Sequence, residues 1–238
     1  MGSVNKIMTV CRAVKDMMMQ EGPVSFIYKL PGRVSKYLSH SLSADTFKFN
    51  GNGYSYCCSL FNFTFRTERA VEIPIALDYV ERFEGKRIIE VGNVLNHYRK
   101  FEHDVVDKYE KVPGVINQDI AEYRPSKKYD LIVSISTIEH IGFDEEPKDK
   151  AKVVLALERM SDLLADNGTI IITFPWGYNT GLDAMLIDGR LKFDNTYYLK
   201  RISKNNKWRQ TGLDEIRYAR FGYPYPYGNA LVVAEVRR

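Results

Sequence analysis

Short runs of mostly apolar residues, separated by polar segments, fill the second half of the chain. They are Arg87–Val91, Asp104–Asp107, Val115–Asn117, Leu131–Ser134 and Thr169–Phe174. Strands that are apolar along most of their length are typical of a parallel sheet with helices on both faces. The pattern therefore predicts an α/β fold built on a mostly parallel sheet.

Helical periodicity appears before and between these runs. Thr67–Phe83 and Lys150–Leu164 each place apolar residues along one side, and Asn167-Gly168 follows the second segment as a helix stop. The tail is expected to return as two strands, Glu215–Phe221 and Ala230–Val236, the last of them antiparallel. These elements extend the predicted sheet to the end of the chain.

The first part of the chain follows different patterns. Aromatic residues alternate on both sides of Asn50-Gly51-Asn52-Gly53, which predicts a β-hairpin. Val4–Met18 and Phe26–Leu38 are basic and apolar at helical spacing. Such helices pack on a main domain, or they contact a membrane surface or a partner. We expect residues 1–66 to form a helical and β-hairpin appendage and residues 67–238 to form the main domain.

Composition and charge narrow the class of protein. A chain of 238 residues with 45% hydrophobic and 27% charged residues is large enough for one substantial core. Its net charge of +4 mildly favours an anionic partner but is far from that of a dedicated nucleic-acid binder. Its three cysteines form no even disulfide framework, and the chain has neither a signal peptide nor an apolar stretch of spanning length. We expect a cytoplasmic protein, at the inner face of the membrane if the first helix binds lipid.

Five motifs occur in a characteristic order along the predicted sheet. They are Ile88-Ile89-Glu90-Val91-Gly92, Val105-Val106-Asp107, Asn117-Gln118-Asp119-Ile120, Tyr129–Ser134 with Glu139-His140, and Leu163–Gly168 followed by Thr169–Pro175. In this order they resemble the motifs of class I S-adenosylmethionine-dependent methyltransferases, over about residues 69–236. The resemblance implies a Rossmann-like fold, S-adenosylmethionine as the cofactor and methyl transfer as the reaction.

The resemblance also implies a role for each motif residue. Ligands of open parallel sheets lie beyond the carboxyl ends of the strands. At those ends Glu90 would address the cofactor's amino group, the turn Gly92-Asn93 its methionyl part, and Asp107 its ribose hydroxyls. Asp119 and Ile120 would hold the adenine ring, and Ser136 would complete the cofactor site.

Two features depart from the family pattern. The first loop usually carries two or three glycines, whereas residues 92–98 contain only Gly92. Seventeen positions separate Glu90 from Asp107 and twelve separate Asp107 from Asp119. Since a crossover between parallel strands needs about a dozen residues or more, we expect the helices on that side of the sheet to be short or absent.

His140 is the candidate catalytic base, and Asp144 and Glu145 are candidates for the group that orients it, with an exposed acidic loop as the alternative for these two residues. A hydroxyl acceptor must lose a proton during in-line methyl transfer, and imidazole titrates near neutral pH. A purely structural role for His140 is the alternative, and a carboxylate acceptor would hardly need a base. The spacing of the histidines, acids and cysteines predicts no structural zinc site. A catalytic divalent ion at His140 and Asp144 is an alternative that no motif supports.

The acceptor is expected to be a small molecule or a glycan and not a nucleic acid. Methyltransferases of nucleobase amines carry an Asp/Asn-Pro-Pro-aromatic tetrad after the fourth strand, where this chain reads Ser134-Ile135-Ser136-Thr137. Aromatic residues in 174–179 and 221–227 are either walls of an acceptor pocket or core filler. A basic stretch is either solvated surface or a site for a nucleotide-diphosphate sugar: Lys200, Arg201, Lys204, Lys207 and Arg209.

Glu90–Tyr98 and Trp176–Asn179 resemble methyltransferases associated with surface polysaccharide and glycan assembly. This predicts O-methylation of a sugar hydroxyl or a uronic acid carboxylate on a nucleotide-sugar or lipid-linked glycan. A nicotinamide-dependent Rossmann oxidoreductase is the alternative enzyme, weakened by the missing Gly-x-Gly-x-x-Gly motif. A non-catalytic partner of a glycan-assembly complex, which keeps the fold without turnover, is the third hypothesis.

Overall fold

The computed structural model of the chain describes residues 31–32, 34–35 and 37–238. The helix predicted over Val4–Met18 lies outside these residues. The one predicted over Phe26–Leu38 is described in part, and residues 31–32, 34–35 and 37–41 are helical. Within the described part of the chain, no helix is long and apolar enough to cross a membrane.

The main sheet has eight strands in the order β5-β4-β3-β6-β7-β10-β8-β9. They are β3 (Ile88–Val91), β4 (Asp104–Val106), β5 (Val115–Ile116), β6 (Tyr129–Ile135), β7 (Leu164–Pro175), β8 (Asn195–Arg201), β9 (Trp208–Thr211) and β10 (Ala230–Arg237). β3 to β7 pair in parallel, and β10 is antiparallel to both β7 and β8. β8 consequently runs in the direction of β7. The prediction of a mostly parallel sheet with an antiparallel C-terminal strand is confirmed.

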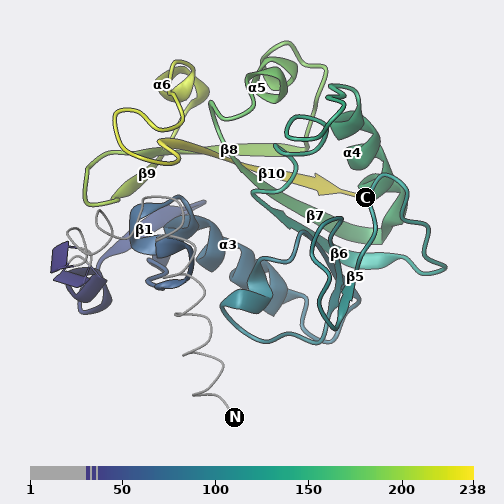
Figure 1. Ribbon diagram of the computed structural model, residues 1–238, viewed down its shortest axis with the longest axis horizontal. Coiled ribbons are helices and arrows are strands. Elements are labelled where there is room, and N and C mark those ends of the chain that lie inside the picture. Colours follow the sequence, from purple (N-terminus) through teal and green to yellow (C-terminus); the bar gives the residue numbers. More distant parts are fainter. Residues whose placement is uncertain (1–30, 33, 36) are drawn as a thin grey trace.

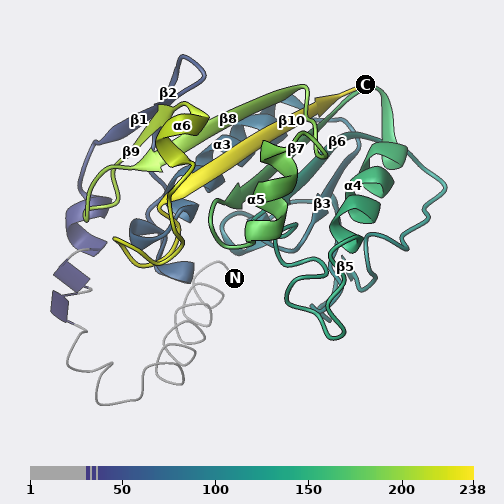
Figure 2. The same ribbon diagram turned by 90° about the horizontal axis from the view of Figure 1, so that it is seen from above.

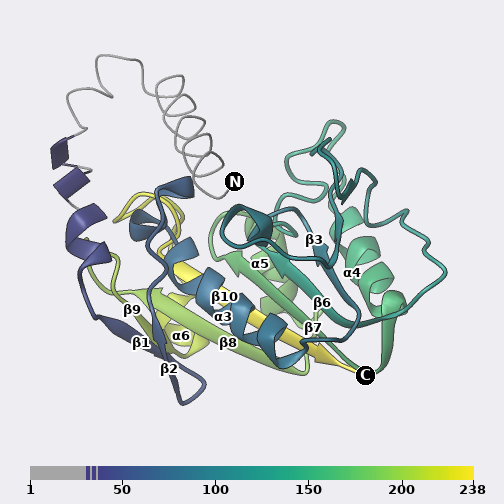
Figure 3. The ribbon, with the colours of Figure 1, turned by 90° about the horizontal axis from the view of Figure 1, so that it is seen from below.

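Helices cover both faces of this sheet, as predicted (Figure 1). One face carries α3 (Arg69–Arg82), which packs on inward-facing strand residues such as Leu131 and Val133. The other face carries α4 (Lys152–Leu163), α5 (Thr180–Ile187) and the short α6 (Leu213–Ile216), with Ile132 on that side. Successive residues of β6 thus enter opposite cores, as the two-residue period of a strand requires. Figure 3 shows α3 lying along the sheet.

The crossovers on the β5 side of the sheet are short, as the motif spacing predicts. Between β3 and β4 there is only a single 3-10 turn, η2 (Leu95–His97), and neither the β4–β5 nor the β5–β6 connection contains a helix. Leu95 is fully buried and packs, with Tyr98 and Phe101, on the α3 side of the core. Loop side chains therefore close the core where a crossover helix usually lies.

The predicted β-hairpin is present as β1 (Thr46–Phe49) and β2 (Asn52–Ser55). Asn50 and Gly51 form its two-residue turn with φ of 47° and 81°, which suits the Asn-Gly sequence. Phe47 and Phe49 are buried in the core on the α3 side, and Figure 2 shows the hairpin beside β9. A 3-10 segment, η1 (Phe61–Arg66), leads from the hairpin to α3. The domain boundary after residue 66 stays a prediction.

Two predictions about the elements are wrong, the end of one helix and the presence of one strand. α4 ends at Leu163 and β7 begins at Leu164, so Asn167-Gly168 lies within the strand and does not end the helix. The strand predicted over Glu215–Phe221 is absent, because α6 covers its start and turns follow. The strand beside β10 is β8, whose sequence is largely polar and whose only fully buried apolar residue is Leu199.

Candidate functional site

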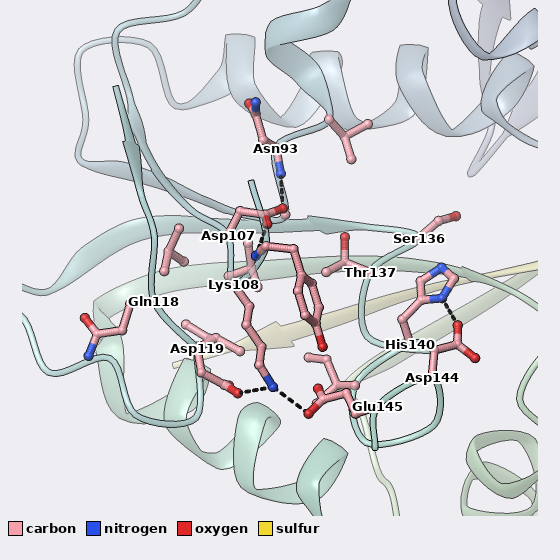
Figure 4. A pocket seen from close by; sticks show the side chains of 17 residues that line it. Asn93, Asp107, Lys108, Gln118, Asp119, Ser136, Thr137, His140, Asp144 and Glu145 are labelled. Carbon is pink, nitrogen blue, oxygen red and sulfur yellow. Dashed lines mark hydrogen bonds and ion pairs between the residues drawn. The ribbon is translucent and has the colours of Figure 1, made fainter. Parts of the chain in front are cut away.

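A cavity of about 390 Å³ lies at the carboxyl ends of β3, β4, β5 and β6 (Figure 4). Its walls include every predicted site residue except Glu90. These wall residues are Gly92, Asn93, Asp107, Asp119, Ile120, Ser136, His140 and Asp144. Residues from four separate connections therefore meet at one edge of the sheet, where open parallel sheets bind their ligands.

The backbone at Gly92 is held tightly between two neighbouring connections. Its N–H donates to the carbonyl of Val106 at 2.9 Å, and its φ is 87°, a conformation that L side chains rarely adopt. A Cβ at this position would lie 2.2 Å from Oγ1 of Thr137. The turn after β3 therefore requires glycine both for its φ and for its contact with the loop after β6.

Glu90 supports this turn from behind and does not reach the cavity wall. Its side chain is fully buried, and Oε1 accepts the N–H groups of Val94 and Leu95 at 2.7 Å each. Oε2 lies 3.1 Å from Nε2 of His103, a partner that sequence reasoning missed. In this arrangement Glu90 fixes the loop backbone, and direct contact with a cofactor amino group stays a prediction.

Asp107 organises the loops around the end of β4. Its Oδ2 accepts the N–H of Asn93 at 3.1 Å, and its Oδ1 accepts the N–H groups of Tyr109 and Glu110 at 2.8 Å each. A carboxylate has about four acceptor positions. Oδ2 consequently keeps one position for a donor inside the cavity.

Asp119 belongs to a closed network of two lysines and two carboxylates. Figure 4 shows three of its members, Asp119, Lys108 and Glu145, at the lower end of the cavity. Its Oδ2 lies 3.1 Å from Nζ of Lys108 and 2.7 Å from Nζ of Lys152. Glu145 contacts both lysines, and its Oε2 lies 2.6 Å from Lys108. Burial raises the pKa of Asp119, but hydrogen bonds from Lys152, Ala121 and Lys108 outweigh it and hold the pKa below its usual value.

Lys108 and Glu145 also line the cavity, although the motifs do not contain them. Each lies in a loop one or more positions beyond a motif, and only the fold brings them together. Ile120 and Ile141 add apolar wall beside the network. This end of the cavity therefore offers a flat apolar surface next to fixed charges.

Ser136 contributes its backbone to the cavity and turns its hydroxyl away from it (Figure 4). Its Oγ donates to Oε1 of Glu72 in α3 at 2.7 Å, and Thr173 donates to the same oxygen at 2.8 Å. Glu72 is fully buried, and burial raises its pKa. Ser136, which has a positive φ of 37°, thus fixes the loop after β6 to α3.

His140 and Asp144 also line the cavity, beside Glu145 of the lysine network (Figure 4). Nδ1 of His140 is 2.5 Å from Oδ2 of Asp144, and the hydroxyl of Tyr178 donates to that same oxygen at 2.7 Å. Burial raises the pKa of Asp144, but the hydrogen bonds from His140 and Tyr178 outweigh it and keep the pKa low. Asp144 is therefore ionised at neutral pH and orients the ring.

The other ring nitrogen of His140 is available for chemistry. Nε2 lies 3.6 Å from Oε1 of Glu139, which is beyond hydrogen-bond distance. Burial raises the pKa of Glu139 well above its usual value, which weakens any ion pair between this carboxyl and the ring. Asp144 therefore holds the His140 ring through Nδ1, and Nε2 is left free to accept a proton, as general-base catalysis requires.

Aromatic rings pack beside His140. The rings of His140 and Tyr178 have centroids 4.9 Å apart, and Tyr178 lies edge-on to Phe221 at 5.0 Å. Tyr178 is held by the loop before α5, where Asn179 caps the helix by accepting the N–H groups of Gly181 and Leu182 at 3.1 Å each. Phe174 and Trp176 are buried in the core, whereas Tyr178 and Phe221 do not line the cavity, so an acceptor wall built from these segments stays a prediction.

Asp183 ties the same loop to α5, and its burial has a consequence for stability. Oδ2 accepts the N–H of Gly177 at 2.9 Å, and the residue is buried. Burial raises the pKa of Asp183 to about 7, and the Gly177 hydrogen bond only partly opposes this. Between pH 4 and 7 the folded state therefore holds a proton that the unfolded chain has released, and stability falls as the pH rises.

We expect the free energy of unfolding of the wild type to fall relative to that of Asp183→Asn as the pH rises. Over the two pH units between pH 5 and 7, the free energy of unfolding should fall by about 3 kcal/mol. Urea titrations at pH 5 and pH 8 measure the difference. Asp166→Asn is the matched control, because the Asp166 side chain is 93% exposed. Parallel pH profiles for the wild type and Asp183→Asn would contradict the proposed burial effect.

Among residues 31–32, 34–35 and 37–238, no group of three or more His, Cys, Asp or Glu side chains is placed to hold a metal ion.

Comparisons with known proteins give only distant likenesses. No protein-family model and no curated protein sequence matches the chain. A solved S-adenosylmethionine-dependent methyltransferase from Archaeoglobus fulgidus is 16% identical, with 75% of this chain and 98% of that chain covered and a TM-score of 0.44. The N-methyltransferase NodS from Bradyrhizobium japonicum, in complex with S-adenosyl-L-homocysteine, is 11% identical, with 69% and 84% covered and a TM-score of 0.42. Because these values are low, we base the function on the site itself.

Proposed function

We propose that the chain is an S-adenosylmethionine-dependent methyltransferase. The observation that carries the proposal is the cavity at the carboxyl ends of β3 to β6, which brings the Gly92 turn, Asp107 and Asp119 together with the His140–Asp144 pair. These are the positions that the motif order relates to cofactor and acceptor.

The cavity has the chemistry that this cofactor needs. Gly92 presents bare backbone, as the close approach to Thr137 requires, and would face the methionyl part. The remaining acceptor position of Asp107 suits a ribose hydroxyl, and Ile120 beside Asp119 offers an apolar face for adenine. The volume of about 390 Å³ lies in the usual range for a small-molecule site. When bound, the cofactor supplies a methyl group on a positively charged sulfur.

The acceptor is an oxygen, in the form of a sugar hydroxyl or a uronic acid carboxylate of a nucleotide-sugar or lipid-linked glycan. Nε2 of His140 takes up the proton of a hydroxyl, and ionised Asp144 stabilises the resulting imidazolium through Nδ1. Tyr178 and Phe221 provide flat aromatic faces on which a sugar ring packs.

A nicotinamide-dependent oxidoreductase is disfavoured by the first crossover. Dinucleotide sites of this kind place a pyrophosphate at the N-terminus of the helix that follows the first strand. In this chain β3 is followed by the 3-10 turn η2 and not by an α-helix. No helix N-terminus is therefore available at that place.

Two calorimetric titrations and one transfer assay test the proposed function. We expect S-adenosylhomocysteine to bind and NADH not to bind, and we expect label from S-adenosylmethionine to appear on one member of a nucleotide-sugar panel or cell extract, identified by its mass. Tight NADH binding without a response to S-adenosylhomocysteine would overturn the proposal. Cofactor binding without transfer to any acceptor would support a non-catalytic partner of a glycan-assembly complex instead.

The proposal includes a cytoplasmic location and a peripheral membrane contact through the N-terminal helix. The net charge of +4 and the basic, apolar pattern of residues 4–18 support this contact. Flotation of the full chain with anionic and with neutral vesicles tests it, and equal recovery in both would contradict an electrostatic contact.

A further inference from the structure

A second cavity, of about 560 Å³, lies at the same edge of the sheet as the first. Lys200 and Arg201, at the carboxyl end of β8, line it. β8 runs in the direction of β7, so its carboxyl end faces the same way as the strand ends that hold Gly92 and Ser136. Figure 1 shows α6 and the segment that follows it, in yellow-green to yellow, over this part of the sheet.

The charges that line this cavity are mostly positive. The cations are Lys200, Arg201, Arg209 and Arg220, and the only carboxylate among the lining residues is Glu215. Glu215 lies 2.7 Å from Arg209 and 3.8 Å from Lys200. One carboxylate thus faces four cations, and the cavity keeps an excess of positive charge.

Arg201 is the most informative of these cations, because it is buried. Only 6% of the residue is exposed, and its guanidinium donates to the backbone carbonyls of Arg66 at 3.0 Å and Pro226 at 2.9 Å. No carboxylate of the described residues lies within 4.0 Å of it. A buried cation that contacts no carboxylate is unfavourable. Burial lowers the pKa of Arg201 to about 10, and the charge of Glu68 opposes this only in part. An anion in the cavity would relieve this cost.

Two exposed tyrosines border the same cavity. Tyr218 is 86% exposed and Tyr223 is 70% exposed, which is unusual for side chains of this size. Their faces suit a nucleobase or a sugar ring. Phe221 follows Arg220 of this cavity in sequence, and its ring contacts Tyr178, which packs against His140, so side chains link the second cavity to His140.

We propose that this second cavity is an acceptor subsite that binds the diphosphate of a nucleoside-diphosphate sugar. The proposal rests on the proposed function and deepens it. Lys200, Arg209 and Arg220 meet the phosphate oxygens from the rim, buried Arg201 supplies positive potential beneath them, and the sugar extends past Phe221 toward His140.

Binding of uridine 5′-diphosphate to the full chain, measured by calorimetry with S-adenosylhomocysteine at saturation, tests the subsite. Saturation fills the first cavity and leaves the second as the site under test. We expect the diphosphate and inorganic pyrophosphate to bind, and uridine to bind at least about tenfold more weakly than uridine diphosphate, because charge-assisted hydrogen bonds supply most of the affinity.

The variants keep the buried arginine and change the exposed rim. Lys200→Gln/Arg220→Gln is expected to weaken uridine diphosphate at least about tenfold, in line with two charge-assisted contacts. Arg190→Gln is the matched control, because Arg190 is exposed and pairs with Asp188 away from the cavity. It should weaken binding less than about twofold.

The outcomes separate this proposal from the proposed function. Binding of S-adenosylhomocysteine without any binding of uridine diphosphate or pyrophosphate would overturn the subsite and leave the methyltransferase intact. Competition between uridine diphosphate and S-adenosylhomocysteine, or equal affinity in the rim variant and the control, would also overturn it. If uridine diphosphate binds but S-adenosylhomocysteine does not, the result would support the anion site and contradict the proposed cofactor.

Discussion

Replacing His140 by alanine is expected to lower turnover on a hydroxyl acceptor about 100-fold or more, while the affinity for S-adenosylhomocysteine changes little. The reason is the position of the ring. Asp144 holds Nδ1 at 2.5 Å, and Nε2 makes no hydrogen bond to the protein among the described residues. Alanine removes the only imidazole that lines the cavity, and no other residue of its lining titrates as histidine does near neutral pH.

Two conservative variants separate a base from a structural brace. Asp144→Asn keeps the shape but removes the charge that stabilises the imidazolium, so turnover should fall about tenfold or more. Tyr178→Phe removes only the second donor to Asp144, and its effect should stay below about tenfold. Single-turnover rates with labelled cofactor measure all three variants. A hydroxyl acceptor methylated at the wild-type rate by His140→Ala would remove His140 from the chemistry.

The dependence of the methyl-transfer rate on pH also tests whether His140 acts as a base. The pKa of Asp144 is held low by its hydrogen bonds, so this carboxylate stays ionised throughout the range in which histidine titrates. A base mechanism then predicts that the rate rises with pH in a single step and that this step vanishes in His140→Ala. A carboxylate acceptor needs no such step, and its pH profile would be flat in the same range.

Local sequence signals were sufficient for the elements that depend on neighbouring residues. The Asn50-Gly51 turn, the apolar strand β6 and the one-sided helix α4 all depend on residues close in sequence, and the structure has them. The order of the motifs placed Gly92, Asp107, Asp119 and His140 at one edge of the sheet, because parallel strands expose their carboxyl ends together.

Long-range contacts account for what the sequence did not indicate. β8 is polar along most of its length and becomes a strand because β10 and β9 pair with it on either side. Lys108 and Glu145 are 37 positions apart, and Glu72 reaches Ser136 over 64 positions, so no local pattern connects them. The partner of Glu90 was missed for the same reason, since His103 reaches it only after the first loop has folded back.

Gly92 is the residue whose substitution should damage cofactor binding most. Alanine at a φ of 87° is strained by about 1–3 kcal/mol. Its Cβ would also lie 2.2 Å from Oγ1 of Thr137, and overpacking of this kind costs about 1–3 kcal/mol more. The turn and the loop after β6 must then separate, and both line the cavity. We expect Gly92→Ala to weaken S-adenosylhomocysteine about 100-fold or more, since each 1.4 kcal/mol is about tenfold in affinity.

Gly85 offers a matched control for Gly92→Ala. Its φ is 75°, but nothing lies within 4 Å of a Cβ there, so Gly85→Ala has the backbone strain without the clash. It should lose about 1–3 kcal/mol of stability in urea titrations and keep its cofactor affinity. Adding Thr137→Ala to Gly92→Ala removes Oγ1 and leaves the nearest remaining side-chain atom, Cβ, at 3.1 Å. The double variant should therefore regain part of the lost affinity, even where Gly92→Ala alone is too unstable to assay. Equal cofactor affinity in Gly92→Ala and Gly85→Ala would show that the turn after β3 does not form the cofactor site.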